Sequence, residues 1–80
     1  MNSSFETIRL KLAIQLDIDA DIIKPETDIF DDLDADSLDA VELIIALEDE
    51  FNLSIDADDA EQLKTVGDVA ALVDRLLQKA

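Results

Sequence analysis

Glycine and proline, the residues that most often interrupt regular structure, occur once each in this chain, at Gly67 and Pro25. Few positions therefore favour β-turns, and the apolar residues recur at helical spacing rather than alternating as they do in strands. The chain has 80 residues, which is enough for one small domain with one core. The sequence predicts a single all-α domain over residues 1–80, a small four-helix bundle with three main helices and one short helix.

The first predicted helix begins at Ser3 or Ser4 and ends near Asp17. Ser3 and Glu6 have the spacing of a capping box, in which the two side chains satisfy free N–H groups at the helix start. Helical spacing gives this segment one apolar face, which should pack on the core: Phe5, Ile8, Leu12, Ala13 and Leu16.

A long connection follows over residues 17–35 and contains Pro25. Connections of this length in small domains are usually functional or weakly ordered. Apolar residues along this one predict that it packs against the helices: Ile18, Ile22, Ile23, Ile29, Phe30 and Leu33.

Three further helices are expected after this connection. They cover about Asp36–Asn52, about Ala57–Leu63, and a final segment that starts at Thr65. Thr65 and Asp68 have a spacing close to that of a capping box and should mark the start of the last helix.

The residue types exclude most self-contained catalytic sites. The chain has no Cys, His, Tyr or Trp, so Ser–His and Cys–His pairs and His- or Cys-liganded zinc sites cannot be built. Asp32, Asp34 and Asp36 match the first three ligand positions of an EF-hand, but Ser37 stands where Gly is required and Leu43 where Glu is required. No true EF-hand or other specific metal site is therefore expected.

The net charge of −15 is concentrated in the middle of the chain. Between Glu26 and Glu61 there is no Lys or Arg, and this stretch holds 15 of the 21 acidic residues. Such a charge disfavours nucleic acid and anionic membrane surfaces and favours proteins with basic surfaces. The simplest interpretation of the stretch is a solvated acidic face, but its concentration in one block favours a recognition surface.

No membrane span or targeting segment is expected. The longest apolar runs, such as 43–47, have five residues, whereas a membrane span needs about 20. Residues 1–20 also lack a basic start followed by an apolar stretch. We therefore expect a cytoplasmic monomer.

The helix after Asp36 has two apolar faces. At about 100° per residue, one arc forms the expected core face, and a second arc lies beside Ser37 and Glu48. A helix that buries one face of a bundle needs only one apolar stripe, so the second arc is either a wider core or a partner-contact surface. The expected core residues are Ala40, Leu43, Ile44, Leu47 and Phe51, and the second arc consists of Leu38, Val41 and Ile45.

The tetrapeptide that opens this helix is Asp36-Ser37-Leu38-Asp39. By itself it fits any helix start, because Asp36 can accept backbone N–H bonds and Asp39 lies near the positive end of the helix dipole. Ser37 has no His to take its proton, so any reaction at its hydroxyl needs another enzyme.

The 22-residue run FDDLDADSLDAVELIIALEDEF, from Phe30 to Phe51, resembles the acyl carrier proteins. The resemblance extends over nearly the whole chain and includes the long first connection and the Thr65-Val66 helix start. It implies that Ser37 carries a 4'-phosphopantetheine arm, whose thiol holds an acyl group as a thioester. Asp36, Leu38 and Asp39 would then help present Ser37 to a Mg²⁺-dependent phosphopantetheinyl transferase.

The resemblance also implies partners and a place for the cargo. Basic patches on acyl-processing synthases and transferases would contact Leu38, Val41, Glu42, Ile45 and Glu48. The core face, with Leu47 and Phe51, would line a cleft that shelters the acyl chain. Fatty acid synthesis, polyketide synthesis and other specialised pathways all remain open, and the alternative is an acidic helical binding module without a prosthetic group.

Three acidic residues depart from the family pattern. Asp34 and Asp17 stand where Gly is common, and Asp tolerates a positive φ less well than Gly does. Asp56 replaces a usual Pro at the start of the third helix, where it should serve as an N-cap.

Overall fold

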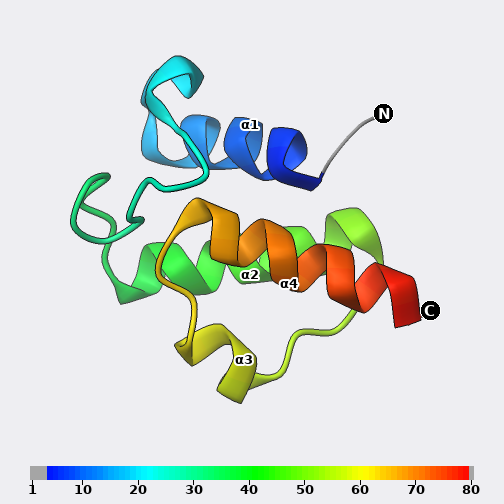
Figure 1. Ribbon diagram of the computed structural model, residues 1–80. Coiled ribbons are helices and arrows are strands. Elements are labelled where there is room, and N and C mark those ends of the chain that lie inside the picture. The colour runs from blue at the N-terminus through cyan, green and yellow to red at the C-terminus, as the bar shows by residue number, and fades with distance from the viewer. Residues whose placement is uncertain (1–3, 80) are drawn as a thin grey trace.

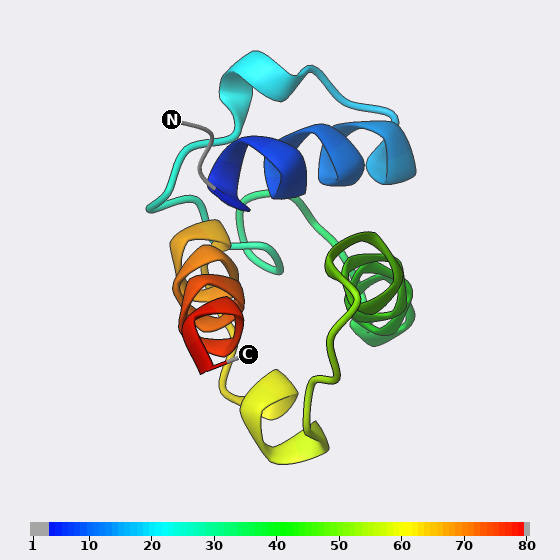
Figure 2. The ribbon, with the colours of Figure 1, turned by 90° about the vertical axis from the view of Figure 1, so that its right-hand side faces the viewer.

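The computed structural model describes residues 4–79, and this part of the chain is built from helices. In chain order these are α1 (Ser4–Leu16), a 3₁₀ helix η1 (Ala20–Ile22), α2 (Ser37–Phe51), α3 (Ala57–Glu61) and α4 (Val66–Lys79). Figures 1 and 2 show α2 and α4 flanking the centre, with α1 crossing one side of the pair and α3 on the opposite side. The predicted all-α bundle is confirmed. Two differences are that α3 ends two residues earlier than expected and that η1 was not predicted.

The core is formed mainly by α1, α2 and α4. Their fully buried side chains recur at helical spacing, which confirms the periodicity of the sequence. None of the residues of α3 is buried, because this five-residue helix is too short to present a continuous apolar face. The largest fully buried side chains are Ile8, Leu12, Ile23, Leu43, Leu47, Val66, Val69 and Val73.

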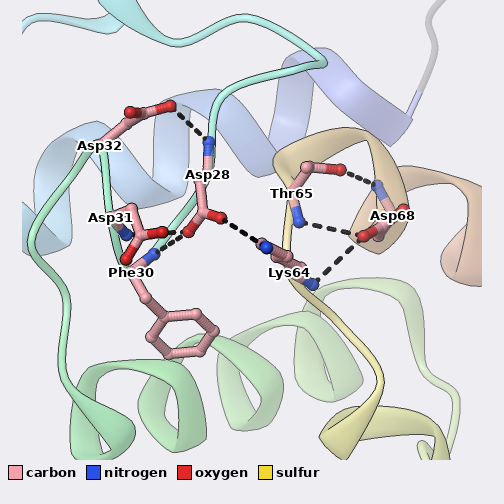
Figure 3. Close-up of polar contacts among 7 residues, drawn as sticks. All are labelled: Asp28, Phe30, Asp31, Asp32, Lys64, Thr65 and Asp68. Atoms are coloured by element: carbon pink, nitrogen blue, oxygen red, sulfur yellow. Dashed lines mark hydrogen bonds and ion pairs between the residues drawn. The ribbon is translucent and has the colours of Figure 1, made fainter.

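The helix starts follow the predicted caps with one exception. Thr65 and Asp68 bond reciprocally, because the Asp68 N–H donates to Thr65 Oγ1 at 3.0 Å and the Thr65 N–H donates to Asp68 Oδ2 at 3.0 Å (Figure 3). Asp56 precedes α3 with extended backbone, yet its exposed carboxylate makes no capping bond, so that expectation is wrong. The Ser3–Glu6 box lies outside the described residues. Ser4 is buried and donates its hydroxyl hydrogen to Asp74 of α4, so it joins two helices.

The Asp68 cap makes the stability of the fold depend on pH. Bonds from the N–H groups of Thr65 and, at 3.2 Å, Lys64 hold the pKa of Asp68 below its usual value of 3.8, against an opposing effect of burial. A carboxylate with a lowered pKa stabilises the fold above that usual value, and the contribution is lost as pH falls through the lowered pKa.

We expect Asp68→Asn to lower the free energy of unfolding by about 0.5 kcal/mol at pH 7, the usual effect of a charge at a helix start. The difference from the native protein should shrink as the pH falls below about 4, where the unfolded-state carboxyl is protonated. Urea unfolding of both proteins between pH 7 and pH 2 measures this dependence. A difference that stays constant over that range would show that the carboxylate charge contributes nothing.

The two aspartates that stand where glycine is common in the family both have left-handed backbone. Asp17 follows α1 with φ 57°, and Asp34 precedes the start of α2 with φ 58°. A side chain with a Cβ is disfavoured in this conformation, whereas glycine adopts it freely.

We expect Asp34→Gly to raise the free energy of unfolding by about 0.5–1 kcal/mol. Removing the steric strain of the Asp34 Cβ stabilises the folded state by more than the added conformational entropy of glycine stabilises the unfolded chain. Urea unfolding measures the change. Asp34→Ala removes the same charge but keeps a Cβ, so it is the matched control. An equal gain in both variants would assign the effect to charge repulsion instead.

The long connection is tied to the segment that joins α3 to α4 and to the first residues of α4. Three backbone bonds join them: Ile29 N–H to the Lys64 carbonyl (2.9 Å), Val66 N–H to the Thr27 carbonyl (2.9 Å) and Gly67 N–H to the Pro25 carbonyl (2.7 Å). A Cβ at Gly67 would lie 2.7 Å from the Pro25 oxygen, so the single glycine permits the close approach of the single proline.

The apolar anchors of this connection only partly pack as predicted. Ile23 and Ile29 are buried, and Ile18 and Leu33 are partly buried against the core. Ile22 and Phe30 are exposed, so the expectation that they pack on the core is wrong. Ile22 lies in η1, which does not contribute a buried residue. No helix in residues 4–79 is long and apolar enough to cross a membrane.

Candidate functional site at the start of α2

Ser37 is the first residue of α2, and its side chain is exposed. A complete capping box surrounds it: the Asp39 N–H donates to Asp36 Oδ1 at 2.9 Å, and the Asp36 N–H donates to Asp39 Oδ2 at 3.1 Å. The expected cap by Asp36 is confirmed, and the bond from the Asp36 N–H to Asp39 adds a second cap that was not predicted. Because these carboxylates complete the helix start by themselves, the Ser37 hydroxyl is not needed to hold it.

The helix start suits a phosphodiester on Ser37. The first N–H groups of a helix have no intrahelical acceptor, and the dipole favours negative charge there. Asp36 and Asp39 oppose such a group electrostatically, but each directs one carboxylate oxygen to a backbone N–H. An exposed hydroxyl at this position can therefore carry the anionic linkage that the resemblance implies.

The second apolar arc of α2 is exposed. Leu38 is 64% exposed, Val41 53% and Ile45 58%, whereas Leu43 and Leu47 are buried on the other side of the helix. The alternative of a wider core is therefore wrong. Glu42 is also exposed and lies one position from Val41, so an apolar stripe with an acidic rim reaches the surface next to Ser37.

An apolar cavity of about 430 Å³ opens beside Ser37. Its walls come from α2, from the long connection, from α3 with the residues on either side of it, and from Val69 of α4. The lining residues are Ile29, Phe30, Ser37, Ala40, Val41, Leu43, Ile44, Ile45, Ile55, Ala57, Ala60, Glu61, Leu63 and Val69.

The cavity differs from the cleft that the sequence predicted. Leu47 and Phe51 do not line it, because Leu47 is fully buried in the core and Phe51 packs against that core. Val41 and Ile45 line it in addition to being exposed, so the stripe and the cavity share two residues. The contributions of Ile55, Ala57 and Ala60 were missed, since no local spacing shows that these residues face α2.

Glu48 has a contact that the sequence did not indicate. Its side chain is half-buried, and its Oε2 accepts the N–H of Ile55 at 2.8 Å. This bond holds the chain after α2 along one wall of the cavity, since Ile55 lines it. Glu48 therefore supports the cavity as well as lying beside the apolar stripe.

Two polar contacts fix α2 on α1. Gln15 Nε2 donates to the Asp39 carbonyl at 2.7 Å near the start of α2. Lys11 Nζ lies 3.1 Å from Glu50 Oε1 near its end. The orientation of the Ser37 turn is thus set by α1, and neither pairing follows from the local sequence.

Comparison with known proteins gives consistent matches over most of the chain. A family model described as "Phosphopantetheine attachment site" matches residues 6–73. The acyl carrier protein of Helicobacter hepaticus is 45% identical over 71 residues, which cover 89% of this chain and 93% of that protein. The acyl carrier protein of Campylobacter jejuni subsp. doylei is 47% identical over 74 residues, which cover 92% and 96% of the two chains.

Solved structures match the fold as well. A chain from Mycobacterium tuberculosis aligns with a TM-score of 0.79 at 39% identity, over 86% of this chain and 95% of that one. The acyl carrier protein from Enterococcus faecalis aligns with a TM-score of 0.71 at 36% identity, over 90% of this chain and 96% of that one.

Proposed function

The chain belongs to the acyl carrier protein family, and from that premise we propose that Ser37 is the residue that bears its 4'-phosphopantetheine arm. Family membership decides between the two hypotheses in favour of a non-catalytic carrier over a binding module without a prosthetic group. The observation that supports Ser37 is its position, because its exposed hydroxyl lies at the start of α2 and beside the apolar cavity. The attached arm supplies a thiol that holds an acyl group as a thioester.

Attachment is a phosphoryl-type transfer to Ser37. Its Oγ forms a bond to the phosphorus of coenzyme A that bears the pantetheine, the phosphoanhydride bond breaks, and adenosine 3',5'-bisphosphate leaves. The hydroxyl proton goes to a base on the transferase, since the chain has no His that could accept it. Asp36 and Asp39 keep the helix start formed while Ser37 reacts, because their capping bonds do not involve its side chain.

Intact mass after incubation with a phosphopantetheinyl transferase, coenzyme A and Mg²⁺ tests this assignment. A gain of one phosphopantetheine, located on the peptide that contains Ser37, is the expected result. Modification on any other peptide would refute it.

The lining of the cavity favours a saturated acyl chain as the cargo. Its lining is aliphatic apart from Phe30, Ser37 and Glu61. Burying a carbonyl without a hydrogen-bond donor costs about 1–3 kcal/mol, so a chain with several ketone groups fits this lining poorly. We therefore favour fatty acid synthesis, or a related lipid pathway, over polyketide synthesis.

The exposed face of α2 is the proposed docking surface. The apolar stripe of Leu38, Val41 and Ile45 with its rim of Glu42 and Glu48 is complementary to a partner that has apolar contacts and a basic rim. Phosphopantetheinyl transferases and acyl-processing synthases with such surfaces are the partners we propose. We propose that the protein is a cytoplasmic monomer, in which this face is free to contact one enzyme after another.

A further inference from the structure

Phe30 occupies a distinct place among the three phenylalanines of the chain. It lines the cavity together with Ser37, whereas Phe5 and Phe51 do not. It is 37% exposed, so one part of the ring faces the cavity and another part faces solvent. Figure 3 shows the ring projecting from the long connection toward α2. Phe30 therefore lies at the mouth of the cavity.

The backbone of Phe30 is held by the carboxylate of Asp28. Asp28 Oδ1 accepts the N–H of Phe30 and the N–H of Asp31, both at 2.8 Å. The Asp28 N–H in turn donates to Asp32 Oδ2 at 2.9 Å, which closes the turn around Phe30. These bonds hold the backbone of Phe30, and rotation about the side-chain bonds is the movement that they leave to the ring.

Asp28 also connects this turn to the opposite segment. It is only 9% exposed, and its Oδ2 lies 3.8 Å from Lys64 Nζ (Figure 3). The N–H of Ile29 bonds the Lys64 carbonyl at 2.9 Å, and both Ile29 and Leu63, the neighbours of Asp28 and Lys64 in sequence, line the cavity. The two walls are therefore joined through Lys64 at the two residues that precede Phe30.

The α3 side of the cavity is built differently. It presents the small side chains of Ala57 and Ala60, and no residue of α3 is buried. Phe30 is therefore the one aromatic side chain in the lining of this cavity, and it stands on a backbone held by Asp28. An aromatic ring in the lining disfavours a side branch on the chain, because forcing a methyl group against packed atoms displaces side chains and backbone.

We propose that Phe30 is a specificity-determining residue that admits straight acyl chains and rejects methyl-branched chains, and that Asp28 is its positioning residue. The inference rests on the proposed function, in which the acyl chain enters the cavity. A hydrophobic pocket discriminates against one misplaced methyl group by about tenfold or more, and we expect about that preference here.

Two eight-carbon chains that differ only in shape test the proposal. A broad-specificity transferase loads n-octanoyl or 6-methylheptanoyl phosphopantetheine from the corresponding acyl coenzyme A. The rate of thioester cleavage by hydroxylamine is then measured on the protein and on free acyl pantetheine, and the ratio of the two rates gives the protection by the cavity.

We expect the native protein to protect the straight chain about tenfold more than the branched chain. In Phe30→Ala this preference should fall to about one, because both shapes then fit. Phe5→Ala removes the same ring away from the cavity and should keep the native preference. Circular dichroism and melting temperature establish that each variant is folded.

Asp28 is tested by a pair of variants with the same readout. Asp28→Asn keeps an oxygen that can accept the Phe30 N–H, so it should retain the preference. Asp28→Ala removes the acceptor and should lose it. If Asp28→Ala does not fold, Phe30→Leu supplies the second comparison and should give an intermediate preference.

The outcomes distinguish failure of the proposed role of Phe30 from failure of the proposed function. Equal protection of both chains by the native protein, or an unchanged preference in Phe30→Ala, overturns the role of Phe30 and leaves the carrier function standing. Protection of neither chain overturns the proposed cargo site and the role of Phe30 with it. Failure to load either chain overturns the assignment of Ser37.

Discussion

Replacing Ser37 with alanine is expected to abolish phosphopantetheine attachment while leaving the fold intact. Ser37 supplies the only proposed acceptor oxygen, so loss of the hydroxyl should reduce loading from complete to undetectable in the intact mass. The exposed side chain makes no hydrogen bond that the helix start requires, since Asp36 and Asp39 cap each other. The free energy of unfolding should change by less than about 0.5 kcal/mol, as for other exposed substitutions.

Ser54→Ala is the matched control for this experiment. Ser54 is exposed in the connection between α2 and α3, away from the capping box. This variant should load as completely as the native protein. Residual loading of Ser37→Ala, or its absence in Ser54→Ala, would contradict the assignment of the attachment site.

Reversing the charge of Glu42 is expected to slow transfer of the arm and of the cargo by about tenfold at low salt, as for rim charges in steered association. Glu42 is exposed beside the apolar stripe, so Glu42→Lys should repel a basic partner without disturbing the core. Its effect on kcat/KM should shrink in 0.5 M NaCl, where the Debye length is only a few ångströms. Initial rates of loading at several salt concentrations measure the effect.

The choice of Glu42 over Glu48 follows from the structure. Glu48 bonds the Ile55 N–H, so its replacement would combine a loss of docking with a change in the cavity wall. Asp21→Lys changes the net charge equally, but it lies in η1 and away from α2, and it serves as the control. Equal effects of the two substitutions would show that the partner responds to net charge alone, without a defined docking face.

The helices and the position of Ser37 could be predicted from the sequence because they depend on residues close together in the chain. Core residues such as Ile8, Leu12, Leu43 and Leu47 lie at helical spacing, and they are buried as predicted. The residues of each pair, Asp36 with Asp39 and Thr65 with Asp68, lie three positions apart, so local spacing was sufficient to predict the Asp36 cap and the Thr65–Asp68 pair. Asp34 was singled out by the family resemblance, since glycine is common at its position, and its φ of 58° is one that glycine adopts freely.

The shape of the site was decided by contacts between distant segments. Helical spacing assigned one apolar arc of α2 to the core but did not decide whether the second arc would also be covered. Packing of α1 and α4 buried one of them and left Leu38, Val41 and Ile45 exposed. The cavity required α3 and the long connection to face α2, and for that reason Leu47 and Phe51 were wrongly assigned to its lining.

The sequence by itself therefore determined the helical class, the family resemblance and the serine to test. Each of these rests on residue type and on spacing within a few turns of helix. Only the tertiary structure decided that Phe30 stands at the mouth of the cavity, that Glu48 supports its wall and that Gly67 meets Pro25. Those contacts join residues that the chain keeps far apart or that lie in irregular segments, and their proximity arises only when the helices pack together.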